Sequence, residues 1–183
     1  MDEAGRGPLA GPLVACAVLL RSGAVLPGVN DSKRLSDRAR RALVPRIMDA
    51  CVLTGTGVVE AAEIDGMGMA RAVAAAFERA SAPVAASGCL FLVDGLPVRG
   101  FPHPAEFVTG GDGRSLSIAA ASILAKVFLD DIMLEADRKW PGYGFAANKG
   151  YGSRSHLDAI RRLGPCPIHR MSFRPLSPGL FDG

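Results

Sequence analysis

The chain has 183 residues, of which 49% are hydrophobic and 21% are charged, and its formal net charge is +3. These values exclude a disordered or fibrous chain and suit one globular domain, with room for a small appendage. The four cysteines do not have metal-ligand spacing, so we expect reduced thiols in a cytoplasmic protein. The apolar run 13–20 is too short to cross a bilayer, and we expect no membrane association.

Apolar runs alternate with helical spacings along the chain. Short apolar runs predict strands at 13–20, 51–59, 90–94 and 106–109. Helical spacing predicts a helix that Ser36 caps and that runs through Ile47, and further helices over 63–79, 117–139 and 155–163. A proline-rich tail follows. This order predicts an α/β fold with a helical C-terminal end.

Basic residues gather in two stretches. One lies between residues 148 and 175 and holds a single acid, Asp158, beside six basic residues: Lys149, Arg154, Arg161, Arg162, Arg170 and Arg174. The other contains Lys33, Arg34, Arg38, Arg40, Arg41 and Arg46. Such patches fit a polyanionic partner, although a solvated helix face explains the second stretch equally well.

The chain opens with a pair of carboxylates. Asp2 and Glu3 stand directly before the glycine-flanked Arg6, in the run Gly5-Arg6-Gly7. Carboxylates bind hard cations and an arginine meets phosphate, so the combination indicates metal-assisted phosphodiester chemistry. A solvated surface pair is the plain alternative.

Further candidate carboxylates lie later in the chain. Asp94 follows a buried strand, where an open α/β sheet binds ligands, although an ordinary Asp-Gly turn explains it too. Asp130 and Asp131 lie in the long predicted helix, part of which is buried. A carboxylate on a buried face needs a partner or a metal. Without further information, we interpret Asp130 and Asp131 as an exposed pair on the solvent side of the helix.

The same residues are compatible with two other functions. Gly5, Gly7 and Gly11 superficially resemble a dinucleotide-binding turn, but that motif needs a strand before it and a helix after it. A nucleic-acid-binding module without catalysis would explain the basic patches but not the carboxylates. Metal-dependent cleavage distinguishes that module from a nuclease.

Six motifs in order resemble those of bacterial ribonuclease HII. They cover nearly the whole chain: Asp2-Glu3-Ala4-Gly5-Arg6-Gly7, Asn30-Asp31-Ser32-Lys33, Leu92-Val93-Asp94-Gly95, residues 117–127 (SIAAASILAKV), Lys149-Gly150-Tyr151-Gly152 and His169-Arg170-Met171-Ser172-Phe173. The resemblance implies an RNase H-like mixed sheet flanked by helices, with a C-terminal helical region. It implies a catalytic core at 1–139 and a basic, substrate-binding region at 140–183.

The resemblance also implies a metal-dependent endonuclease. Its catalytic carboxylates, which hold Mg²⁺ or Mn²⁺, fall on Asp2, Glu3, Asp94 and Asp130. Asp130 is chosen over Asp131 because it lies four residues after Lys126.

The implied substrates are RNA–DNA hybrids and duplex DNA with embedded ribonucleotides, cut by a monomer on the 5′ side of the ribonucleotide to leave 3′-hydroxyl and 5′-phosphate ends. Substrate contacts are implied for Gly5, Arg6, Gly7, Lys33, Lys126, Tyr151, His169 and Arg170.

The N-terminus raises two expectations. Neighbouring residues of a strand point to opposite faces, so Asp2 and Glu3 face the same way only if the chain leaves the sheet there. The family carries about one strand of residues before this pair. We therefore expect the natural protein to begin earlier and Asp2 to lie at the exit of the central strand.

Overall fold

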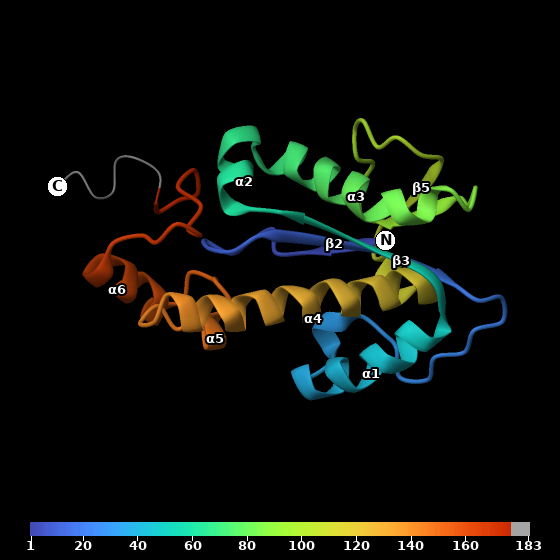
Figure 1. Ribbon diagram of the computed structural model, residues 1–183, viewed down its shortest axis with the longest axis horizontal. Helices are drawn as coiled ribbons and strands as arrows, with labels where there is room; N and C mark the ends of the chain where they lie inside the picture. Colours follow the sequence, from blue (N-terminus) through green and yellow to red (C-terminus); the bar gives the residue numbers. More distant parts are fainter. Residues whose placement is uncertain (177–183) are drawn as a thin grey trace.

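The computed structural model describes residues 1–176. A mixed sheet lies between two layers of helices (Figure 1). On one face lies α3 (Met69–Ala85), preceded by the short α2 (Ala61–Met67). On the other lies α4 (Leu116–Lys139), with α1 (Asp37–Ala50) packed on its outer side.

The sheet is built around a very short central strand. Strands β2 (Leu13–Leu20) and β3 (Cys51–Val59) are antiparallel, and β1 (Asp2–Ala4) pairs antiparallel with the other edge of β2. Strands β4 (Phe91–Asp94) and β5 (Ala105–Val108) pair in parallel.

Residue 1 joins these two parts of the sheet. The Met1 amino group donates to the Leu92 carbonyl at 2.6 Å, and the Asp94 N–H donates to the Met1 carbonyl at 3.0 Å. This is the hydrogen-bond pattern of a parallel pair, and it gives the order β3-β2-β1-β4-β5. Asp2 lies on the central strand, as expected, but at its first residue and not at its exit.

Shorter elements complete the chain. Two short 3₁₀ turns, η1 (Ser32–Arg34) and η2 (Gly111–Gly113), precede α1 and α4. The C-terminal part holds α5 (Phe145–Asn148) and α6 (Arg154–Leu163). Ser36 and Ser153 cap α1 and α6 by accepting hydrogen bonds from backbone N–H groups.

The predicted strands and helices are confirmed to within one or two residues, with one exception. The helix predicted over 63–79 is wrong, because Gly68 has a φ of 79° and separates α2 from α3. A left-handed residue ends a helix, and glycine adopts that conformation without steric cost. The prediction also missed the single turn of α5 and gave no bounds for β1.

Apolar side chains fill both sides of the sheet. One cluster packs α3 against the sheet and includes Leu13, Ile64 and Phe77. The other packs α4 against the opposite face and includes Val14 and Met133. Within residues 1–176, no helix is long and apolar enough to span a membrane.

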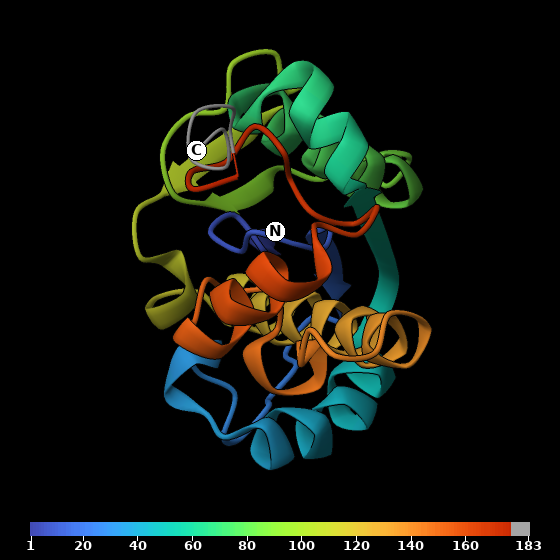
Figure 2. The ribbon, with the colours of Figure 1, turned by 90° about the vertical axis from the view of Figure 1, so that its left-hand side faces the viewer.

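The C-terminal region packs onto the same α4-side cluster. Tyr143, Phe145 and Ile160 belong to it, and the segment after α6 runs back towards α2 (Figure 2). The functional division at residue 139 stays a prediction. The end of the predicted tail, residues 177–183, lies outside the described residues.

Candidate active site

Two carboxylates follow neighbouring strands at one edge of the sheet. Asp94 ends β4, and Asp112 lies four residues after β5. Because the strands are parallel, their carboxyl ends meet. The Gly95 N–H donates to the Val108 carbonyl at 3.1 Å, and the Gly111 N–H donates to Asp94 Oδ1 at 2.6 Å. These bonds hold the two carboxylates beside each other.

Asp2 and Glu3 stay within the ladder of β1, opposite Cys16 and Ala15 of β2. Their side chains accordingly lie on opposite faces of the sheet, as expected for strand neighbours. The Asp2 carboxylate meets the Ser122 hydroxyl of α4. Glu3 lines a cavity beneath α3.

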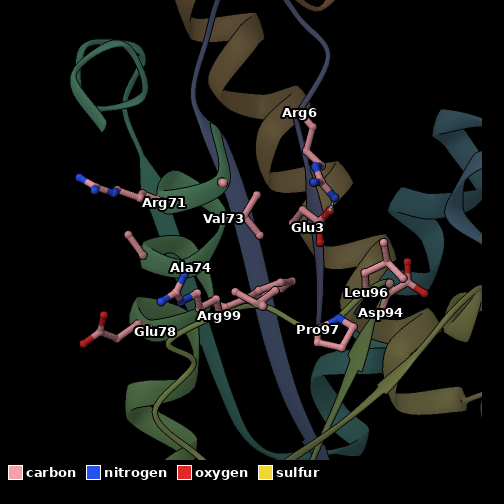
Figure 3. Close-up of a pocket in the computed structure, with 15 residues that line it drawn as sticks. Glu3, Arg6, Arg71, Val73, Ala74, Glu78, Asp94, Leu96, Pro97 and Arg99 are labelled. Atoms are coloured by element: carbon pink, nitrogen blue, oxygen red, sulfur yellow. Dashed lines mark hydrogen bonds and ion pairs between the residues drawn. The ribbon is translucent and has the colours of Figure 1, made fainter. Parts of the chain in front are cut away.

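That cavity has a volume of about 920 Å³. Glu3 and Arg6 lie together on one wall, with Asp94 nearby and residues of α3 opposite (Figure 3). Arg6 Nη1 donates to Glu3 Oε1 at 3.2 Å. Phe77 forms part of the apolar wall, while Arg71 and Arg99 lie along the rim. The space is thus a mixed cavity with Glu3 and Asp94 on one side and Glu78 of α3 on the other.

Burial and mutual repulsion disturb these acids. Burial raises the pKa of the Asp2 carboxyl to about 7, and the nearby Glu3 charge adds to the shift. Burial also raises the pKa of Glu3, against the opposing effect of Arg6. The pKa of Asp112 is raised by burial and then by the charges of Asp31 and Asp94. Each of these acids lacks full compensation for its negative charge.

Asp130, the predicted fourth carboxylate, lies apart from Asp2, Glu3 and Asp94. Asp2 meets α4 at Ser122, and Asp130 lies eight residues further on, about 12 Å along the helix. Asp130 is only 1% exposed and is held between cations: Lys126 Nζ at 2.6 Å and Arg40 Nη2 at 3.7 Å.

Asp112 is the residue that sequence reasoning missed. It lies in the glycine-rich turn Gly110-Gly111-Asp112-Gly113, which looks like a plain loop. The available signal was its position just after a strand parallel to β4, which places it at the same edge as Asp94.

The Gly5-Arg6-Gly7 loop lies next to the carboxylates and carries an exposed aromatic ring beside it. A Cβ built on Gly7 would come within 3.6 Å of the Tyr151 ring, and Tyr151 is 49% exposed. Gly5 has a φ of 100°, and a Cβ there would lie 2.6 Å from the Pro12 carbonyl oxygen. Only glycine fits at Gly5. The structure therefore brings together Gly5, Arg6, Gly7 and Tyr151.

The two lysines predicted to contact the substrate, Lys33 and Lys126, differ in exposure and in their partners. Lys33 is largely exposed, and its Nζ lies 3.8 Å from Asp112 Oδ2. Lys126 is mostly buried and pairs with Asp130. Lys33 pairs with Asp112 from an exposed position, whereas Lys126 is engaged in an internal ion pair.

His169 and Arg170, also predicted to contact substrate, are buried. They are 2% and 0% exposed, so neither side chain reaches a nucleic acid in this structure. Arg170 hydrogen-bonds backbone carbonyls between residues 5 and 12, and His169 Nε2 lies 3.1 Å from His156 Nε2. Both residues support the loops rather than lie on the surface.

The donor set fits a hard divalent cation. Carboxylate oxygens are the ligands that Mg²⁺ and Mn²⁺ prefer, and a cation would relieve the repulsion that raises the pKa values of Asp2, Glu3 and Asp112. With the side chains as they stand, no three acidic, histidine or cysteine groups within residues 1–176 converge closely enough to hold an ion.

A mixed sheet between two layers of helices, with carboxylates on and beside its central strands, is the architecture of the RNase H-like fold. Solved structures agree. The ribonuclease HII in a complex with PCNA from Archaeoglobus fulgidus matches with a TM-score of 0.79 at 23% identity, over 96% of this chain and 93% of that chain. Ribonuclease H2 from Pyrococcus horikoshii matches with a TM-score of 0.74 at 24% identity, over 96% and 92% of the two chains.

Sequence comparison narrows the class. The family model for ribonuclease HII matches residues 1–175. The ribonuclease HII of Syntrophotalea carbinolica is 49% identical over 95% of this chain and 83% of its own length. That of Geobacter metallireducens is 49% identical over 95% and 82%. The chain belongs to the ribonuclease HII family and is an endoribonuclease that acts on RNA–DNA hybrids.

The alternative readings of the glycine-rich N-terminus are therefore wrong. A strand, β2, follows Gly11 where a dinucleotide-binding turn needs a helix. A binding module without catalysis does not agree with the family.

Proposed function

We propose that this endoribonuclease cuts duplex DNA on the 5′ side of an embedded ribonucleotide as well as RNA within hybrids. One observation carries the proposal: the Gly5–Gly7 loop and the Tyr151 ring lie together beside the carboxylates. The 2′-hydroxyl distinguishes RNA from DNA, and a loop without side chains at Gly5 and Gly7 lets backbone groups approach it closely.

The carboxylates that we propose as metal ligands are Asp2, Glu3, Asp94 and Asp112. Asp2 and Glu3 leave β1 on opposite faces, but the charge of Asp94 acts on both, so we place the ion at the sheet edge beside Asp94. Asp112 replaces Asp130 in this set because it lies beside Asp94, whereas Asp130 is neutralised by Lys126 and Arg40. When bound, Mg²⁺ or Mn²⁺ activates the attacking water and stabilises the leaving oxygen, which gives 3′-hydroxyl and 5′-phosphate ends.

The protein's own groups orient this site. The Gly111 N–H fixes Asp94, and Arg6 restrains Glu3 at the mouth of the cavity. Tyr151 offers an exposed ring on which a sugar or base can stack. His156 and His169 are buried and bonded to each other, so we assign no proton transfer to them. The monomeric state and cytoplasmic location stay predictions from the sequence.

The test uses a duplex with one ribonucleotide and compares four variants with the wild type. Asp94→Asn and Asp112→Asn should each lower the cleavage rate by more than about 100-fold, because loss of a supporting group alone costs 10–100-fold in metal sites. Asp131→Asn, an exposed residue paired with Arg41, is the matched control and should cleave normally.

Asp130→Asn decides between the two candidate ligand sets. If the folded Asp112→Asn variant cleaves normally and Asp130→Asn does not, then Asp130 and not Asp112 is the fourth metal ligand. A 2′,3′-cyclic phosphate among the products would contradict water attack.

A further inference from the structure

The buried guanidinium of Arg170 is bonded to the back of the Gly5-Arg6-Gly7 loop. Nη2 donates to the Gly5 carbonyl at 2.7 Å and to the Pro12 carbonyl at 2.9 Å. Nε donates to the Gly11 carbonyl at 2.9 Å, and Nη1 to the Arg6 carbonyl at 3.2 Å. Four of the five N–H donors of an arginine are thus used on one turn of backbone.

These bonds fix which way two peptide groups face. In a trans peptide the C=O and the following N–H point in opposite directions. The Gly5 and Arg6 carbonyls point inward to Arg170, so the N–H groups of Arg6 and Gly7 point outward. Both residues are exposed, and within residues 1–176 neither N–H donates to another group.

Residues 169 and 170 also hold the loop that carries Tyr151. The Arg170 N–H donates to the Leu9 carbonyl at 2.8 Å, and the Leu9 N–H donates to the Gly150 carbonyl at 2.8 Å. His169 Nε2 meets His156 Nε2, whose ring donates through Nδ1 to the Tyr151 carbonyl at 2.8 Å. The Gly5–Gly7 loop and the Tyr151 loop are therefore tied to one support.

Arg170 keeps its charge in this position. Burial lowers the pKa of its guanidinium to about 10, which is still above physiological pH. A cation behind the loop attracts the carbonyl ends of the peptides and leaves the N–H ends for an acceptor at the surface.

We propose that Arg170 is a positioning residue: it presents the Arg6 and Gly7 N–H groups to the ribonucleotide and thereby sets the discrimination between ribose and deoxyribose. This inference rests on the proposed function and deepens it. A site built to hydrogen-bond a hydroxyl discriminates strongly against the analogue that lacks it, provided its donors are fixed. Arg170 supplies that fixation without touching the substrate.

The test measures binding without metal, so that no cleavage occurs. Dissociation constants are compared for a duplex with one ribonucleotide and for the same duplex in all-deoxy form. Arg170→Lys keeps the charge, but its single ammonium cannot span four carbonyls. The ratio of the two constants should fall by about tenfold, as expected from loss of one or two oriented hydrogen bonds, and kcat for the single-ribonucleotide duplex should fall with it.

A matched control separates positioning from stability. Ile47→Val removes one methyl group from the core between α1 and α4, in a cluster that contains none of residues 5–12 or 164–173. It should lower the melting temperature and leave the ratio unchanged. A ratio in Arg170→Lys equal to that of the wild type would overturn the inference, even if that variant melts early.

A measurement on the wild-type protein covers the case in which Arg170 variants fail to fold. The Arg6 and Gly7 amides should exchange hydrogen quickly in the free protein and be protected by the ribonucleotide duplex more than by the all-deoxy duplex. Equal protection by both duplexes would overturn the inference. Absence of any cleavage by the wild type with metal would instead contradict the proposed function.

Discussion

Asp130 is held between Lys126 and Arg40 and is almost fully buried. Removing one partner of a buried ion pair leaves the other charges uncompensated. We therefore expect Asp130→Asn to lower the free energy of unfolding by about 3 kcal/mol, while the folded enzyme still cleaves. Urea unfolding and cleavage measured on the same preparation test this.

Asp131→Asn is the control for that prediction, because Asp131 is exposed and pairs with Arg41 on the surface. Its loss should cost less than about 1 kcal/mol. A stability loss in Asp130→Asn no larger than in the control would show that the buried pair contributes little.

Tyr151 contributes an exposed ring beside Gly7. Aromatic stacking on nucleic acid is worth about 1–3 kcal/mol per contact. Tyr151→Ala should therefore slow cleavage at a single ribonucleotide by about tenfold or more while nonspecific DNA binding changes little. Tyr151→Phe keeps the ring and should behave as the wild type. Equal losses in cleavage and nonspecific binding would mean that Tyr151 only supports its loop.

The sequence predicts some residues of the candidate site and not others. Asp94 was predictable because it closes an apolar run, which identifies a strand end from local residues alone. Asp112 was not, because its place beside Asp94 depends on the pairing of β4 with β5. Arg170 lies in a basic stretch typical of a surface, and only its contacts with residues 5–12 show that it is buried.

At the scale of elements, α3 forms the wall of the cavity opposite Glu3 and Asp94 (Figure 3). Arg71 of this helix and Arg99 of the loop after β4 lie at its rim. Neither forms an ion pair with another residue in 1–176. Free cations beside a nuclease site are expected to meet backbone phosphates.

We predict that replacing Arg71 and Arg99 by Ala together weakens binding to hybrids and reduces its dependence on salt. Each lost phosphate contact should lower the slope of log affinity against log salt by about 0.9. Binding measured at several salt concentrations gives that slope. Arg138→Ala is the control, because Arg138 lies at the far end of α4 and pairs with Glu135. An unchanged slope in the double variant would place the nucleic acid elsewhere.

Strands and helices, like single residues, were predictable only where the local sequence identifies them. Strands β2 and β3 and helix α4 are long enough for their apolar patterns to identify them. Strand β1 has three residues, too few for a pattern, and its central position depends on hydrogen bonds from Met1 to a strand some ninety residues away. The break at Gly68 required knowing that this particular glycine adopts a positive φ, which spacing alone did not indicate.

At the scale of the whole molecule, the C-terminal segment connects parts that are far apart in sequence. The Met171 and Ser172 N–H groups donate to Asp65 of α2 at 2.8 and 3.0 Å, while His169 is buried against His156 of α6. Stability of this segment therefore depends on keeping the buried imidazoles neutral. Burial lowers the pKa of His169 to about 4, and the nearby His156 adds to the shift.

That shift predicts a pH dependence of stability. The pKa of His169 lies below its unfolded value of 6.5, so the unfolded chain binds more protons as pH falls. The stabilising contribution of neutral His169 is complete above pH 6.5 and is lost towards pH 4. At pH 5 the loss is about 2 kcal/mol. Asp2 acts in the opposite direction in the metal-free protein, because its raised pKa favours the folded state as pH falls below about 7.

The two effects oppose each other in the wild type, so the comparison uses His169→Gln, which is neutral at every pH. Asp2 and His156 titrate in both proteins, and subtraction removes most of their contribution. The variant should be less stable than the wild type at pH 7, and the difference in free energy of unfolding should shrink by about 2 kcal/mol at pH 5. Urea unfolding at both pH values, in the same chelator, gives this difference. A difference that stays constant from pH 7 to pH 5 would mean that His169 takes up its proton as easily in the folded protein as in the unfolded chain, and that the histidine pair does not make the C-terminal segment sensitive to acid.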